Sequence, residues 1–176
     1  MMRASISALC AIGMLAGIAC HHGAANGDAY GAVAGDTTVL GIVRVSGSDP
    51  GTQVELRPAD NGRGIAVTGA LRGEIGSLSG VAISATGQPV PNQMPSPAMA
   101  IDVRFYEVVS VGDTPARGGM LTRNGTTLWL AGAHDTLELA EPVPARLSSL
   151  VGRRVYVAGT IENHKMIVQA FGAITQ

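Results

Sequence analysis

The sequence predicts an all-β protein with short helical turns, on the strength of three observations. Hydrophobic residues make up 46% of the 176 residues, whereas aromatic residues make up 3%, and there are 24 glycines. Glycine combined with Val, Ile and Thr suits short strands joined by tight turns. Asn61-Gly62 and Asn124-Gly125 each stand between apolar runs. This is a strong hairpin signal, because a type I′ turn requires positive φ at both central residues. The third observation is a pattern of strands that recurs along the chain.

The recurring pattern indicates an internal duplication. Met120–Gly132 aligns with Leu56–Gly69, so that in both segments a glycine stands seven positions after the glycine of Asn-Gly. Further along, Leu78–Gly87 aligns with Leu150–Gly159, again with two glycines seven positions apart. Under this alignment the residues around His134–Pro144 are an insertion in the second copy.

The individual elements follow from the alternation of apolar and polar residues. Leu71, Ile75 and Leu78 share one helical face, which predicts a short helix. Four prolines predict a loop over Gln88–Ala98, and Val108-Val109 breaks the alternation of its strand, as a bulge does. Strands are expected at Thr38–Ser46, Gln53–Arg57, Ile65–Gly69, Gly80–Gly87, Ala100–Val111, Gly118–Leu121, Thr126–Gly132, Arg153–Thr160 and Met166–Thr175.

The order strand, strand, strand, short helix, strand, strand resembles that of the OB fold, a five-stranded Greek-key barrel. Gly118–Ile174 is also similar to small exported bacterial OB-like domains, through its Gly-x-Leu, Asn-Gly, Leu-x-Leu and Leu-Val-Gly-x-x-Val-x-Val-x-Gly-Thr motifs. The resemblance implies tandem small OB-like barrels over 37–112 and 113–176, and it carries no catalytic residue. A single merged β-barrel or sandwich is the alternative.

The N-terminus has the pattern of an export signal. Arg3 precedes Ala4–Ala19, a mostly apolar run of sixteen residues that matches the core of a signal peptide and is short for a transmembrane helix. Cys20 follows Ala19, and the site resembles a bacterial lipoprotein signal, although Gly17 replaces the usual leucine. We expect a signal peptide over 1–19 and lipidation of Cys20, with ordinary cleavage of a soluble secreted protein as the alternative.

The segment 20–36 is rich in Gly, Ala and Asp and is predicted to be a flexible tether. Lipidation of Cys20 would anchor the chain without a membrane-spanning helix. The predicted location of the protein is therefore periplasmic or on the outer surface of the cell envelope.

Catalytic motifs are missing from the sequence. There is no nucleophile elbow, phosphate loop, dinucleotide fingerprint or zinc-site spacing, so no catalytic residue, metal or cofactor is assigned. His134, Asp135 and His164 are the residues on which a metal-assisted hydrolase would depend, as an alternative. The predicted copy over 37–112 has five arginines against six acids, and the copy over 113–176 has six basic residues against five acids, which disfavours an oligonucleotide-binding groove.

The candidate binding surface lies in the second copy. Leu128 and Leu130 are expected to face inward, so Trp129 faces outward, and by the same alternation Tyr156 faces outward beside Arg153 and Arg154. Exposed aromatic and arginine side chains are common at interaction sites. The alternative is that Trp129 and Tyr156 pack the two copies together.

These observations predict a non-enzymatic, exported and lipid-anchored binding or assembly module of the bacterial cell envelope. Its expected partner is an envelope protein or a glycan, with membrane contact through the N-terminal lipid only and no contact with nucleic acid. The alternatives are the metal-assisted hydrolase and an oligonucleotide-binding OB protein.

Overall fold

The structure is a computed structural model that describes residues 35–48, 51–60, 62–91 and 99–176. Several predictions fall outside these residues: the signal peptide, Cys20, the tether up to residue 34, Asn61 of the Asn61-Gly62 pair, and positions 92–98 of the proline-rich loop.

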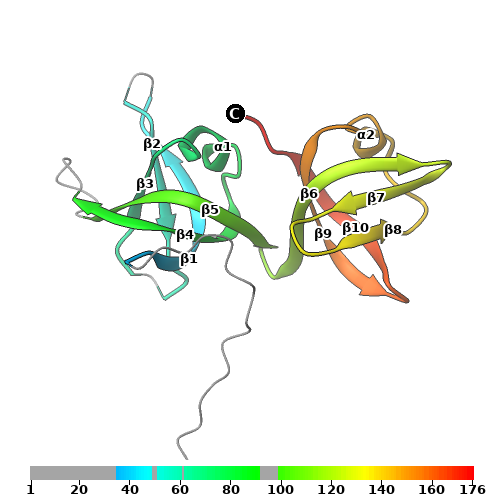
Figure 1. Cartoon of the computed structure of the whole chain (residues 1–176), viewed down its shortest axis with the longest axis horizontal. Coiled ribbons are helices and arrows are strands. Elements are labelled where there is room, and N and C mark those ends of the chain that lie inside the picture. Colours follow the sequence, from blue (N-terminus) through cyan, green and yellow to red (C-terminus); the bar gives the residue numbers. More distant parts are fainter. Residues whose placement is uncertain (1–34, 49–50, 61, 92–98) are drawn as a thin grey trace, which may run out of the picture.

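The predicted all-β class is confirmed. The strands form one continuous hydrogen-bonded sheet, and two short helices pack beside it (Figure 1). The strands are β1 (Thr37–Ser46), β2 (Gln53–Arg57), β3 (Ile65–Thr68), β4 (Val81–Pro91), β5 (Met99–Val111), β6 (Thr114–Asn124), β7 (Thr127–Ala131), β8 (Thr136–Leu139), β9 (Arg154–Glu162) and β10 (Lys165–Ala173), and the helices are α1 (Arg72–Gly76) and α2 (Ala145–Ser148).

The sheet closes on itself twice. Strands β1 to β5 form a ring, here called the N-terminal unit, in which β3 and β5 pair in parallel and all other neighbours pair antiparallel. Strands β6 to β10 form the C-terminal unit with the same order of pairing, and β8 and β10 are its parallel pair. In both units the helix lies between the third and fourth strands.

In each unit the first strand pairs with one neighbour along its first part and with another along its second part, and the two pairings meet at one residue. Ile42 of β1 pairs with both β2 and β4, and Met120 of β6 pairs with both β7 and β9. A glycine precedes each of them. A Cβ on Gly41 would stand 3.1 Å from backbone atoms of Arg57, and one on Gly119 would clash with the carbonyl oxygen of Ala131. A side chain would therefore be crowded at Gly41 and excluded at Gly119, where the strand turns from one neighbour to the other.

The segment that leads into the fourth strand also matches between the units. The N–H of Gly80 donates to the carbonyl of Val43, at 2.9 Å, and the N–H of Gly152 donates to that of Leu121, at 2.8 Å. Gly80 and Gly152 have φ values of 87° and 84°, which L-residues with side chains rarely adopt. The predicted alignment of Leu78–Gly87 with Leu150–Gly159 therefore agrees with the backbone.

The alignment of the two Asn-Gly pairs is wrong. Asn124 ends the first strand of its unit, so this pair connects the first and second strands, whereas residues 58–64 connect β2 to β3, the second and third strands of theirs. The segment treated as an insertion contains β8 (Thr136–Leu139), which is the third strand of the C-terminal unit. This strand was missed because it has four residues and begins among polar ones.

The turn type at Asn124 is also different from the predicted type I′. Asn124 pairs with Thr127, so the two turn residues are Gly125 and Thr126, and of the pair Gly125 alone has positive φ, at 60°. This is the pattern of a type II′ turn. A turn with positive φ at both residues joins β9 to β10 instead, through Asn163 (50°) and His164 (65°).

Strand β4 extends into the predicted proline-rich loop. Pro89 and Pro91 pair with β5, while the pairing of β4 with β1 ends at Gly87. Within the described ranges, one edge of β4 therefore has no partner strand beyond Gly87, and an open edge tolerates residues without an N–H. The predicted bulge is confirmed, because the register of β5 against β4 skips Val109.

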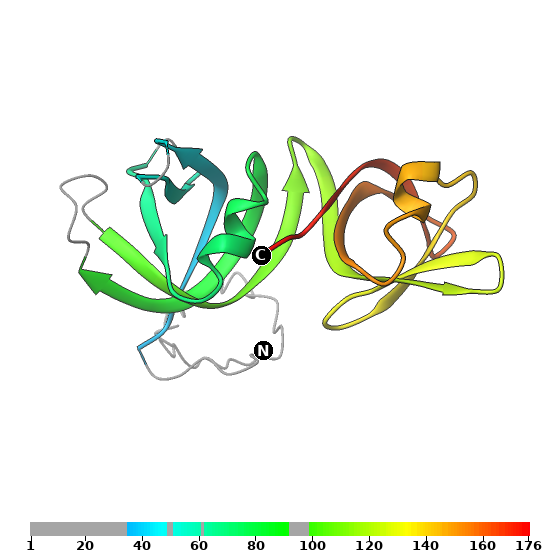
Figure 2. The same ribbon diagram turned by 90° about the horizontal axis from the view of Figure 1, so that it is seen from above.

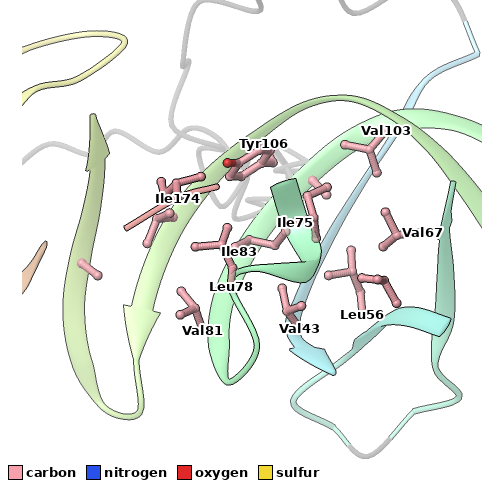
Figure 3. Close-up of a cluster of buried hydrophobic side chains, with 14 of the residues drawn as sticks. Val43, Leu56, Val67, Ile75, Leu78, Val81, Ile83, Val103, Tyr106 and Ile174 are labelled. Carbon is pink, nitrogen blue, oxygen red and sulfur yellow. The ribbon is translucent and has the colours of Figure 1, made fainter. Parts of the chain in front are cut away.

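Each unit has its own cluster of buried side chains, but the N-terminal cluster extends across the junction. Besides residues such as Val43, Ile75 and Ile83, it includes Ile174 (Figure 3), which lies beyond β10. Ala116 and Ala158 from the C-terminal unit also belong to it. The two units are therefore joined by a shared apolar contact as well as by the β5–β6 turn.

Replacing Gly159 by alanine tests the close approach of β9 and β10. An added Cβ would clash with the carbonyl of Ile167, so we expect the free energy of unfolding to fall by roughly 3 kcal/mol, measured by urea denaturation. Gly73→Ala is the matched control, because its Cβ would meet its nearest atom at 3.8 Å and a helical alanine is favoured over glycine by about 1 kcal/mol. Equal stability of the Gly159→Ala variant and the unmodified protein would contradict the packing.

Candidate functional site

A cleft lies between the two units. Strands β5 and β6 are paired only at Ser110–Pro115 and Val111–Thr114, and beyond this turn they diverge (Figure 2). The cleft has a volume of about 600 Å³. Its lining comes from β5 (Arg104–Val108), β6 (Arg117–Met120), the end of β7 with the loop after it (Leu130–Asp135), and Leu71, Glu74, Leu137, Arg154 and Ile174.

One wall of the cleft holds a charged side chain that is withdrawn from water. Glu74 of α1 is 6% exposed and is the buried charged residue among those the structure describes. Its Oε1 accepts hydrogen bonds from the Tyr106 hydroxyl and from the Arg154 guanidinium, which comes from β9 of the other unit. An uncompensated buried carboxylate is costly, so Glu74 requires this arginine.

Tyr106 completes the group. The guanidinium carbon of Arg154 lies 5.9 Å from the centroid of the Tyr106 ring, within the range of a cation–π contact. Burial, followed by the hydrogen bond to Glu74, raises the pKa of Tyr106 far above its usual value. The phenol therefore stays protonated and remains a donor to Glu74.

The C-terminal residues cross the junction beside this group. The chain passes from the C-terminal unit to α1 (Figure 1). The Ile174 N–H donates to the Arg154 carbonyl, at 2.9 Å, and the Thr175 N–H donates to the Ser77 hydroxyl, at 3.1 Å. The segment after β10 thus holds the units together next to the cleft.

A second polar contact spans the cleft at its rim. The Nε2 of His134, in the loop between β7 and β8, lies 2.8 Å from the Glu107 carboxylate on β5. On the same strand, Arg104 is 3.2 Å from Asp36 and 3.3 Å from the side-chain oxygen of Gln88. These charges are compensated within the protein.

Two charged residues of the lining are not compensated. Arg117 on β6 and Asp135 after β7 are exposed. Neither side chain has a hydrogen-bond or ion-pair partner among the described residues. Met120, which is 40% exposed, provides apolar surface next to them. The cleft therefore offers one cation, one anion and an apolar wall to a ligand.

The residues predicted as a binding surface do not form one group. Trp129 is half-buried on the outward side of β7, between the buried Leu128 and Leu130, and it does not line the cleft. Tyr156 is half-buried and packs against the core cluster of the N-terminal unit. Their partners on β6 are Thr122 and Gly118, four residues or about 13 Å apart along the strand.

The two predicted arginines have different surroundings. Arg154 joins Glu74 across the junction, whereas Arg153 is exposed and contributes its backbone carbonyl to the Leu121 N–H. The counterpart of Trp129 in the N-terminal unit is Glu55, because Ile42 pairs with Arg57 as Met120 pairs with Ala131.

The residues of the hydrolase alternative are likewise divided. His134 and Asp135 line the cleft, whereas His164 lies in the β9–β10 turn and does not. Among the described residues no group of three His, Cys, Asp or Glu side chains is arranged to hold a metal ion.

Sequence reasoning missed Glu74, Tyr106 and Arg117. Glu74 carries a readable signal, since it stands within the apolar helical face formed by Leu71, Ile75 and Leu78. A charged residue on such a face requires a buried partner. Nothing in the sequence identifies that partner as Arg154, which is 80 positions away.

Comparisons of the chain with protein-family models, with curated proteins and with solved structures find no match. Across the described ranges, no helix has the length and apolar character needed to cross a membrane.

A double-mutant cycle tests the ion pair between the units. We expect Arg154→Ala to lower the free energy of unfolding by about 2 kcal/mol, because it leaves Glu74 with one donor; the exposure of the Arg154 side chain, 46%, keeps the loss below that of a fully buried pair. The coupling energy between Arg154→Ala and Glu74→Gln is expected to be about 1–2 kcal/mol.

Arg146→Ala is the control for this cycle. Arg146 is exposed on α2, at the place that corresponds to Glu74 on α1, and its replacement should change stability by no more than about 0.5 kcal/mol. Additive effects of the Glu74 and Arg154 substitutions in urea denaturation would contradict the pairing.

The raised pKa of Tyr106 predicts a loss of stability at high pH. Above pH of about 10 the phenol ionises in the unfolded chain but keeps its proton in the folded one. The unfolded state then binds fewer protons, so stability falls by about 1.4 kcal/mol per pH unit until the folded pKa is reached. Tyr106→Phe should remove this part of the slope, and equal slopes for the two proteins would refute the shift.

Proposed function

We propose that this chain is an exported binding module of the cell envelope, held by a lipid on Cys20, whose ligand site is the cleft between two OB-like units. The proposed role is non-enzymatic, and the partner is an envelope protein or glycan, or a fragment of one. The observation that carries the proposal is a cleft of about 600 Å³ lined by both units, because ligand sites of about 300–1,000 Å³ commonly lie where two units meet.

An origin of the two units by internal duplication is part of the proposal. Its support is the shared strand order, the parallel pairing of third and fifth strands, and the helix between third and fourth strands. The glycines at 41 and 119, and those at 80 and 152, make matching contacts in the two units. Such backbone matches need not be kept in unrelated strands, and the strand order is consistent with a five-stranded Greek-key barrel.

The junction supports a rigid site. The Glu74–Arg154 ion pair, the His134–Glu107 contact and Ile174 connect the units around the cleft. A preformed site loses less conformational entropy when a ligand binds. Arg117 and Asp135 remain available to the ligand.

The proposed location in the cell envelope is based on the N-terminal sequence. The apolar run Ala4–Ala19, the small residues before Cys20 and the Gly- and Ala-rich segment after it support export, lipidation and a tether. A soluble secreted form is the alternative. Mass analysis of the mature N-terminus decides between them.

Oxidative footprinting tests the cleft as the binding site. Met120 is 40% exposed within the cleft, and Met99 is 59% exposed outside it. When the purified protein is incubated with cell-envelope extract and treated with hydrogen peroxide, we expect less sulfoxide at Met120 and unchanged sulfoxide at Met99, measured by mass spectrometry of peptides. A bound ligand covers the first thioether and leaves the second accessible.

Trp129→Ala provides the control variant. Trp129 lies outside the cleft, so protection of Met120 should persist in this variant. Extract that leaves Met120 oxidation unchanged contradicts a cleft ligand, and protection that disappears with Trp129 would move the site to the outer face of β7.

A further inference from the structure

The charges of the cleft restrict what it can hold. Of its three carboxylates, Glu74 is bonded to Arg154 and Tyr106, and Glu107 is bonded to His134, which leaves Asp135. Of its three arginines, Arg104 and Arg154 have acidic partners, which leaves Arg117. Among the residues that the structure describes, the unsatisfied charges of the cleft are therefore one of each sign. A ligand that matches both carries a negative and a positive group at once.

These two residues approach the cleft from neighbouring segments. Arg117 is next to Gly118 in β6. The carbonyl oxygen of Gly118 lies close to Gly132, since a Cβ built on Gly132 would be 3.5 Å from it. The Gly132 N–H in turn donates to the carbonyl of Asp135, at 2.8 Å. The backbone segments that carry Arg117 and Asp135 thus lie side by side, and both residues line the cleft.

The wall between them has little side-chain bulk. Gly118, Gly119 and Gly132 line the cleft without side chains, and neighbouring segments pack against them. Gly118 itself has no spare room, because a Cβ would stand 3.1 Å from Val108. These glycines allow the segments that carry Arg117 and Asp135 to pack closely at the cleft.

Apolar side chains also line the cleft. Met120 is 40% exposed, and Leu137 and Phe105 are half-buried in the lining. Burial of a ligand's aliphatic side chain on Met120 and Leu137 would be favourable, because it removes apolar surface from water. A purely polar zwitterion would leave this surface exposed to water.

We propose that the cleft binds a short peptide with free ends, its carboxylate on Arg117, its ammonium group on Asp135, and an aliphatic side chain against Met120. This inference rests on the proposed function and specifies its ligand class. A guanidinium binds a carboxylate through two parallel hydrogen bonds, and a carboxylate accepts from an ammonium group. The compensated pairs around them keep the other charges of the cleft from competing for either end.

The test uses the folded chain and the dipeptide Leu-Leu as the probe, followed by calorimetry or by NMR shifts. We expect Leu-Leu to bind, and both N-acetyl-Leu-Leu and Leu-Leu amide to bind about tenfold more weakly or worse, since each loses one charge-assisted hydrogen bond. Arg117→Gln should abolish the difference between Leu-Leu and its amide. Asp135→Asn should abolish the difference between Leu-Leu and its acetylated form.

Glycerophosphoethanolamine, which joins a phosphate to an ammonium group, tests a lipid headgroup as the source of the zwitterion. Binding of this compound as tight as that of Leu-Leu would overturn the assignment to peptides. So would failure of Leu-Leu to bind, or equal binding of the free and capped dipeptides.

The outcome is separable from that of the proposed function. If envelope extract protects Met120 while Leu-Leu does not bind, the peptide assignment fails and the binding site stands. If neither probe affects the cleft, both proposals fail.

Discussion

The carboxylate of Glu74 is buried between the two units, and the arrangement of the junction depends on how its charge is compensated. Its partners are Tyr106 from its own unit and Arg154 from the other one. Because a buried carboxylate without a partner is costly, α1 and β9 are required to stay together. The apolar residues Ile174, Ala116 and Ala158 add burial to the same contact. The relative position of the units is thus determined by chemistry as well as by the β5–β6 turn.

The cleft follows from this junction. Strands β5 and β6 leave their turn side by side and diverge into separate closed rings, so the space between them is bounded by both. Close contacts at glycines keep the strands of the C-terminal unit near one another at the edge of this space. The paired charges are directed at each other across the junction, while Arg117 and Asp135 are exposed in the lining of the cleft. A rigid frame with two free charges of opposite sign is the basis of both proposals.

Much of the fold was readable because alternation reports which side of a strand is buried. Alternation predicted most of the strands and the bulge at Val109, and the helical spacing of Leu71, Ile75 and Leu78 predicted the first helix. It failed where the local signal was short or shared between different connections. Thr136–Leu139 has too few residues for a clear pattern, and two Asn-Gly pairs that look equivalent join different strands. Strand pairing is a long-range property, and a turn motif does not specify which members of a sheet it connects.

By itself, the sequence determined the all-β class, the inward orientation of Leu128 and Leu130, and therefore the outward orientation of Trp129, since side-chain direction along a strand is local. It also placed a charged residue, Glu74, on an apolar helical face. The tertiary structure decided what these residues meet. It brought Arg154 to Glu74 across 80 positions of the chain, separated Tyr156 from Trp129, and placed Arg117 and Asp135 in one cleft without a partner among the described residues. Contacts between the units depend on how two closed sheets are positioned in space, which no local pattern specifies.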